Sequence, residues 1–131
     1  MDPLDFYFKH PTIIQVSGPT RCGKTILVSR ILKEQLIQPF STRIIWVFGE
    51  WQPDYDIIRE RYPSIEFEKD WRDEIFDSLS PEQRDILVLD DQICVASSSA
   101  SVADLFTKGS HHRNLTVIYL VPNVYNQDKS Q

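Results

Sequence analysis

The sequence lacks the features that mark secreted and membrane proteins. Its 131 residues contain only two cysteines, Cys22 and Cys94, which is too few for a disulfide scaffold, so we expect reduced thiols. No apolar stretch approaches the roughly 20 residues that cross a bilayer. The first five residues are acidic and lack the basic start of a signal peptide. These absences predict a soluble, intracellular protein of the nucleus or cytoplasm with no membrane partner.

An excess of basic residues is also missing. The formal net charge is -5 and the sequence pI is about 5.1, which argues against a broad basic surface for nucleic acid. DNA would have to be held by a few loops of an oligomer. The apolar content of 41% and the charged content of 25% are ordinary globular values. We therefore expect one domain over residues 1–131, with a lead-in over 1–10 and a frayed polar end over 126–131.

The chain is predicted to alternate between strands and helices. Short apolar or β-branched runs ending at Gly, Pro or acidic residues predict strands, and apolar residues spaced four apart predict helices. The expected strands cover residues 12–16, 43–48, 86–89 and 115–121, with a minor edge strand over 65–67. The expected helices cover 24–37, 54–61, 70–79 and 97–108. Because parallel strands need crossover connections, this order predicts an α/β fold: a mostly parallel sheet between two layers of helices.

A glycine-rich motif follows the first expected strand and begins the first expected helix. It matches the phosphate-binding pattern G-x-x-x-x-G-K-[ST], which arises by chance in roughly 0.5% of chains of this length. Backbone amides can wrap a polyphosphate only where glycines allow the chain to bend. The lysine would reach the β- and γ-phosphates, and the threonine hydroxyl would ligate Mg²⁺. The motif residues are Gly18, Pro19, Thr20, Arg21, Cys22, Gly23, Lys24 and Thr25.

Two carboxylates end the apolar run over residues 86–89. An acid at the carboxyl end of a buried strand lies at the sheet edge where α/β folds bind ligands. We predict that Asp90 holds Mg²⁺, through bound water, and that Asp91 orients or deprotonates the attacking water. A solvated turn is the alternative for an isolated pair of aspartates, and the preceding phosphate motif favours the functional interpretation.

Two further polar residues are candidates near the last expected strand. Arg113 could act across a subunit boundary as an arginine finger, and Asn123 could sense the γ-phosphate. A polar turn is the alternative for the segment around Arg113. His111 and His112 lack further ligands at zinc spacing, so we expect no metal there. Trp51 follows a strand, where self-packing or a subunit contact would cover it.

Five segments together resemble the DNA-packaging ATPases of the FtsK–HerA type, particularly those of poxvirus-like and Polinton (Maverick)-like elements. The resemblance spans nearly the whole chain, and its second, third and last segments are the most specific. The segments are GPTRCGKT over 18–25, RIIW over 43–46, GEWQP over 49–53, LVLDD over 87–91 and FTKGSHHRNLTVIYLV over 106–121.

The resemblance implies a P-loop NTPase fold and an ATPase whose ring pumps double-stranded DNA into a capsid. The ligands that the resemblance implies are ATP and Mg²⁺, and the partners that it implies are DNA and capsid proteins. It also implies that strand 115–121 lies between the phosphate-loop strand and the Asp90 strand. Two departures stand out: Pro122 replaces a glutamine that usually contacts the γ-phosphate, and the chain ends before a further core strand. Together the two departures predict a C-terminally truncated or decaying copy.

Three interpretations of function stay open. The first is Mg²⁺-dependent ATP hydrolysis with Lys24 and Asp91 as catalytic residues. The second is a non-catalytic nucleotide-binding remnant of such an ATPase. The third is a small-molecule kinase, which would need an acceptor pocket and an arginine-rich lid within residues 50–84.

Overall fold

The computed structural model describes residues 7–18, 23–40, 43–79, 81–90 and 114–121. The predicted helix over 97–108 and the predicted frayed end over 126–131 lie outside these ranges. No helix within them is long and apolar enough to span a membrane.

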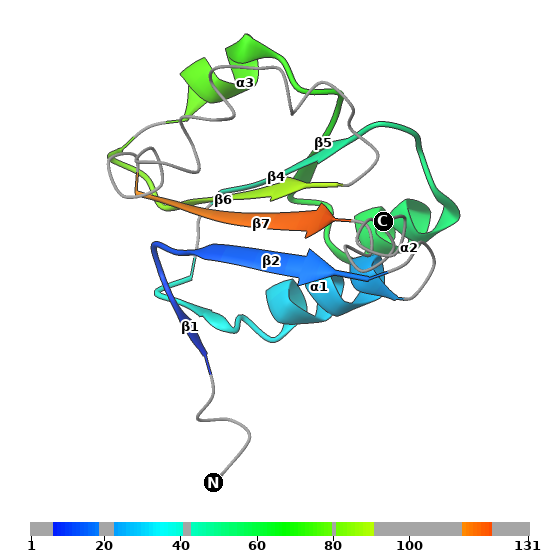
Figure 1. Ribbon diagram of the computed structural model, residues 1–131, viewed down its shortest axis with the longest axis horizontal. Helices are drawn as coiled ribbons and strands as arrows, with labels where there is room; N and C mark the ends of the chain where they lie inside the picture. The colour runs from blue at the N-terminus through cyan, green and yellow to red at the C-terminus, as the bar shows by residue number, and fades with distance from the viewer. Residues whose placement is uncertain (1–6, 19–22, 41–42, 80, 91–113, 122–131) are drawn as a thin grey trace, which may run out of the picture.

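Five parallel strands form the central sheet (Figure 1). Their order is β2-β7-β6-β4-β5, and each adjacent pair is parallel. The expected parallel sheet is therefore confirmed. The position of β7 between β2 and β6 also agrees with the strand order that the resemblance implied. The strands are β2 (Ile13–Ser17), β4 (Arg43–Phe48), β5 (Ile65–Lys69), β6 (Asp85–Leu89) and β7 (Leu115–Val121).

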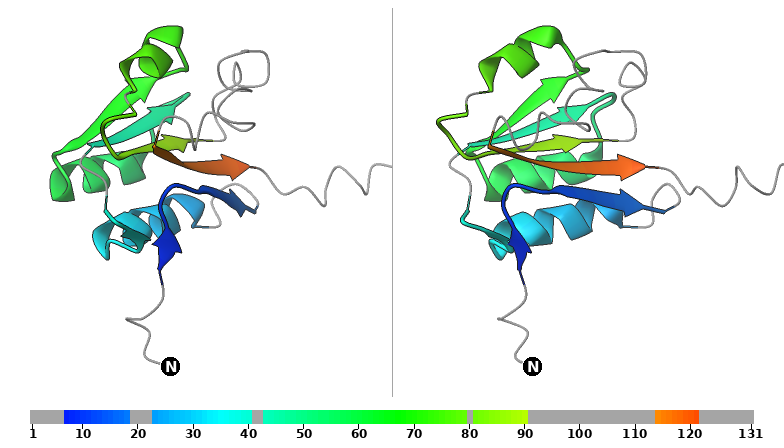
Figure 2. Two further views of the ribbon diagram at one scale, coloured as in Figure 1. Left: turned by 90° about the vertical axis from the view of Figure 1, so that its left-hand side faces the viewer. Right: turned by 60° about the vertical axis from the view of Figure 1, so that its left-hand side comes forward.

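Helices cover both faces of this sheet, which gives three layers (Figure 2). Alternate residues of a strand point to opposite faces. In β4, Ile44, Trp46 and Phe48 pack with α1 (Lys24–Lys33) and α2 (Pro53–Arg61). Ile45 and Val47 pack on the other face with Ile75 of α3 (Asp73–Ser78) and its flanking residues. The predicted sandwich of helices around a sheet is confirmed at this level.

The first helix is shorter than predicted. The four-residue apolar spacing runs on to Leu36 and a helix was predicted to residue 37, but α1 ends at Lys33. Gln35 has a φ of 52°, a left-handed conformation that stops the helix. Ile37 is buried in β3 (Ile37–Gln38), which pairs in parallel with β1 (Phe8–Lys9). Burial of residue 37 is achieved by a strand, so the apolar spacing alone gave the wrong boundary.

The helix predicted to begin at Asp70 also starts later. Asp70 has a φ of 59° and its N–H donates to Phe48 O at 2.6 Å, so it ends the strand region instead of capping a helix. The residue before α3 is Arg72, in an extended conformation. Trp71 and Leu79 flank the shortened helix and are still buried beneath it, as predicted.

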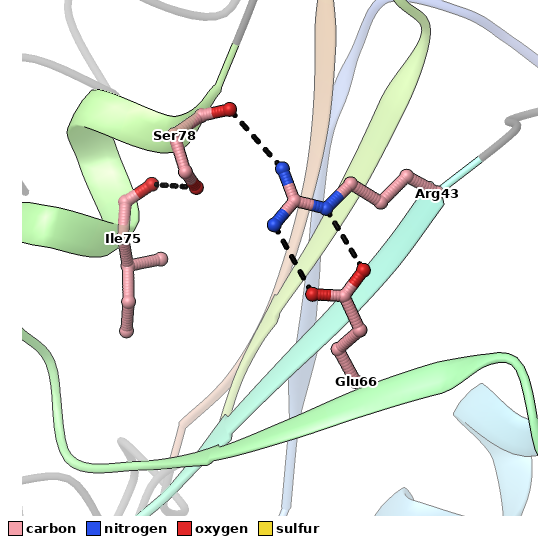
Figure 3. Close-up of polar contacts among 4 residues, drawn as sticks. All are labelled: Arg43, Glu66, Ile75 and Ser78. Atoms are coloured by element: carbon pink, nitrogen blue, oxygen red, sulfur yellow. Dashed lines mark hydrogen bonds and ion pairs between the residues drawn. The ribbon is translucent and has the colours of Figure 1, made fainter.

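Arg43 connects α3 to the sheet edge through an ion pair with Glu66 of β5 and a hydrogen bond to the last residue of α3 (Figure 3). Arg43, the first residue of β4, donates two hydrogen bonds to the Glu66 carboxylate at 2.9 and 3.1 Å and one to Ser78 O at 3.1 Å. The hydrogen bonds to Glu66 raise the pKa of Arg43 above its ordinary value. A groove of about 150 Å³ lies beside this pair, with Arg72 and Glu74 also on its wall.

Candidate functional site

The two ends of the glycine motif are held by β2 and α1. Gly18 follows β2 directly, and its N–H donates to Val121 O at 3.3 Å. Gly23 has a φ of 96°, in the region that L side chains rarely adopt. A Cβ there would meet nothing within 4 Å, so the backbone conformation, rather than space, calls for glycine. Pro19, Thr20, Arg21 and Cys22 lie outside the described residues.

The start of α1 is suited to an anion. The first amides of a helix have no intrahelical acceptor, and they carry the positive end of the helix dipole. The first turn of α1 contains no acidic residue, and Leu27 N–H makes the first helical bond to Gly23 O at 2.9 Å. Thr25 is half-buried in this turn. A phosphate bound here would meet donors without a competing carboxylate.

Lys24 is a buried cation that joins the ends of two strands. Its side chain is 7% exposed. Nζ donates to Gly18 O and to Val121 O, each at 2.9 Å. Ser17 and Val121 are partners in the β2–β7 register, so both carbonyls lie at the carboxyl edge of the sheet. Lysine is seldom buried without partners, and here backbone carbonyls hold its ammonium group beside the glycine motif.

Asp90 lies at the same edge, directly after β6. It is 3% exposed, and its N–H donates to Val47 O at 3.0 Å. Ile86 and Val88 pack on the face that carries α1 and α2, so strand alternation directs Asp90 to that face. Its Oδ2 accepts a hydrogen bond from the hydroxyl of Tyr55 in α2. Asp90 and Lys24 therefore share one edge and one face of the sheet.

Sequence reasoning missed Tyr55. Its partner Asp90 is 35 residues away, so no local spacing indicates the contact. One signal was present: Tyr55 and Ile58 are three positions apart in a short helix, which places both on one face, and both are buried. A core-facing tyrosine usually needs a hydrogen-bond partner for its hydroxyl. A tyrosine on the buried face of α2 therefore indicates a buried acceptor nearby.

Trp51 packs against its own chain, as one of the two sequence interpretations predicted. Its ring centroid lies 5.2 Å from those of Phe48, Tyr55 and Phe67. Its Nε1 donates to Asp56 Oδ1 at 3.0 Å, and the Arg59 guanidinium lies 4.6 Å from its ring centroid. The indole is still 38% exposed.

The residues present fit a nucleoside triphosphate with Mg²⁺. No group of three His, Cys, Asp or Glu residues within the described ranges could hold a metal by itself. Magnesium usually needs only one or two carboxylates, because water and substrate phosphates complete its shell. Asp90 and the Thr25 hydroxyl would hold the ion, while Lys24 and the first amides of α1 would hold phosphate.

The remaining predicted site residues, Asp91, Arg113 and Asn123, fall outside the described residues. Comparison with known proteins adds no further assignment. No protein-family model matches the chain, and a search of the curated proteins finds no match.

Proposed function

We propose that this chain binds ATP with Mg²⁺ and hydrolyses it. The observation that carries the proposal is Lys24, whose buried ammonium group is held by Gly18 O and Val121 O. Those carbonyls lie at the start of a full phosphate-loop motif and at the carboxyl edge of a parallel sheet, where α/β proteins bind ligands. Asp90 on the same face supplies the carboxylate that a Mg²⁺–triphosphate needs.

Each residue has a distinct role in the proposal. Lys24 holds the β- and γ-phosphates, and the Thr25 hydroxyl and the Asp90 carboxylate orient the metal. Bound Mg²⁺ would neutralise charge on the phosphate oxygens. Asp91 orients the attacking water and accepts its proton. Arg113 from a neighbouring subunit and Asn123 are the further candidates for contact with the γ-phosphate.

More specifically, we propose that the chain is the ATPase module of a DNA-packaging motor. Two features support it: the resemblance to FtsK–HerA type ATPases, and the order β2-β7-β6 expected from it. With a net charge of -5, the chain would contact double-stranded DNA through loops of an oligomeric ring instead of a broad surface.

A second candidate is nucleotide binding without turnover. It is favoured by Pro122, which occupies the position where the family that this chain resembles usually has a glutamine. Proline has neither a side-chain amide nor a backbone N–H, so the γ-phosphate would lose that contact.

Two variants and one control test the roles assigned to Lys24 and Asp91. Lys24→Ala should weaken ATP binding by about 10- to 100-fold, because it removes a charge-assisted contact to phosphate. The matched control is Lys33→Ala, at the exposed end of the same helix, and it should bind as the wild type does. Asp91→Asn should keep binding and lower phosphate release by on the order of 100-fold or more.

The measurements are ATP binding by calorimetry and phosphate release by a coupled assay. Binding without phosphate release in the wild type would favour the non-catalytic candidate. Hydrolysis that is unchanged in both Lys24→Ala and Asp91→Asn would show that the assigned roles are wrong.

A further inference from the structure

Tyr55 and Asp90 form a buried polar contact between α2 and the carboxyl end of β6. Tyr55 is 0% exposed and Asp90 is 3% exposed, and the phenol hydroxyl donates to Asp90 Oδ2. The Asp90 backbone is held independently, because its N–H donates to Val47 O at 3.0 Å. One carboxylate oxygen thus has a fixed neighbour from another layer of the fold.

Aromatic packing determines where the Tyr55 hydroxyl lies. The centroid of its ring is 5.7 Å from that of Trp46, 5.5 Å from that of Phe67 and 5.2 Å from that of Trp51. The contacts with the two indoles are edge-to-face, an arrangement that aromatic pairs prefer. A ring enclosed in this way has few alternative rotamers, so the hydroxyl remains at Asp90.

The same packing connects Asp90 to the protein surface. Trp51 contacts Tyr55 with ring centroids 5.2 Å apart. It also contacts two exposed residues: the Arg59 guanidinium lies 4.6 Å from its ring centroid, and its Nε1 donates to Asp56 Oδ1 at 3.0 Å. A continuous series of contacts therefore runs from a buried carboxylate to a partly exposed indole.

We infer that Tyr55 is the positioning residue of Asp90 in metal binding, and that Trp51 reports when the site is filled. This inference rests on the proposed Mg²⁺–ATP site. Residues that hydrogen-bond a metal-binding carboxylate fix its orientation, and losing one typically weakens metal affinity by roughly 10- to 100-fold. Tyr55 contacts neither phosphate nor the reacting atoms in this role, and acts through Asp90.

Tyr55→Phe removes the hydroxyl and keeps the ring, so the aromatic cluster is preserved. The matched control is Tyr62→Phe, which removes a phenol hydroxyl from the half-buried residue directly after the same helix. Binding of N-methylanthraniloyl-ATP is followed while free Mg²⁺ is raised. The Mg²⁺ midpoint is the free Mg²⁺ concentration at which nucleotide binding is half-maximal, and we expect Tyr55→Phe to raise it about tenfold or more. Nucleotide binding in EDTA should be unchanged. Tyr62→Phe should have the same midpoint as the wild type.

The outcomes separate this role from a structural one and from the proposed function. A lower unfolding midpoint with an unchanged Mg²⁺ midpoint in Tyr55→Phe would overturn the positioning role, and so would an equal shift in Tyr62→Phe. Both results would leave the proposed function intact. Failure of the folded wild type to bind nucleotide with Mg²⁺ would overturn the proposed function together with the role.

Intrinsic fluorescence tests the link to Trp51. Adding Mg²⁺–ATP to the wild type should change tryptophan emission. Because Trp46 and Trp51 both pack on Tyr55, Trp51→Phe should lose part of that change. Trp71→Phe should retain it, because Trp71 packs on the opposite face of the sheet. Full retention of the signal in Trp51→Phe would overturn the link.

Discussion

At the scale of single residues, the candidate site contains two features that proteins seldom show: a backbone at positive φ and a buried ammonium group. Gly23 has a φ of 96° at the start of α1, and Lys24 is buried beside it. The motif spacing predicted both residues, because the chemistry of phosphate binding requires them in sequence order. Tyr55 could not be predicted in this way, since its role arises from a contact across the fold.

The conformation of Gly23 gives a direct prediction. Gly23→Ala should lower the free energy of unfolding by about 1–2 kcal/mol, because a Cβ is disfavoured at positive φ even where space is open. Gly23→Asn should cost less, since asparagine tolerates positive φ better than alanine. Urea denaturation of the three proteins measures this order. Equal stability of Gly23→Ala and the wild type would contradict the strain argument.

At the scale of elements, the sequence located the main strands because each is a short apolar run with clear ends. Strand β6, for example, is buried at all five positions, and its apolar run was predicted directly. The boundaries of α1 and α3 were wrong because left-handed residues, Gln35 and Asp70, stop regular structure without interrupting the apolar spacing. Strands β1 and β3 contain two residues each, which is too short for any periodicity to appear.

The packing of α2 provides a matched pair of substitutions, and this helix carries Tyr55. Ile58 is 2% exposed and Ile57 is 48% exposed. Ile58→Ala should destabilise the protein by about 2–5 kcal/mol, because it leaves a cavity against the sheet, whereas Ile57→Ala should stay within about 0.5 kcal/mol. Chemical denaturation gives both values. Similar losses for the two variants would show that α2 does not pack on this face.

At the scale of the whole molecule, the strand order gathers the site. Because β7 lies between β2 and β6, the ends of all three strands form one edge that holds Gly18, Val121 and Asp90. The apolar periodicity predicted the layers but could not predict the strand order. Because β6 and β7 are both almost entirely buried, their apolar patterns do not show which of them lies next to β2. The order was expected only from the resemblance to packaging ATPases.

The most direct test of the account is calorimetric titration of ATP into the purified chain, with Mg²⁺ and with EDTA, for the wild type and Asp90→Asn. The account predicts that Mg²⁺ strengthens ATP binding by the wild type. Asp90→Asn should reduce this gain by roughly 10- to 100-fold, because an amide is a poor substitute for the metal-holding carboxylate. A wild-type protein with intact circular dichroism and no Mg²⁺-dependent affinity for any nucleoside triphosphate would contradict it.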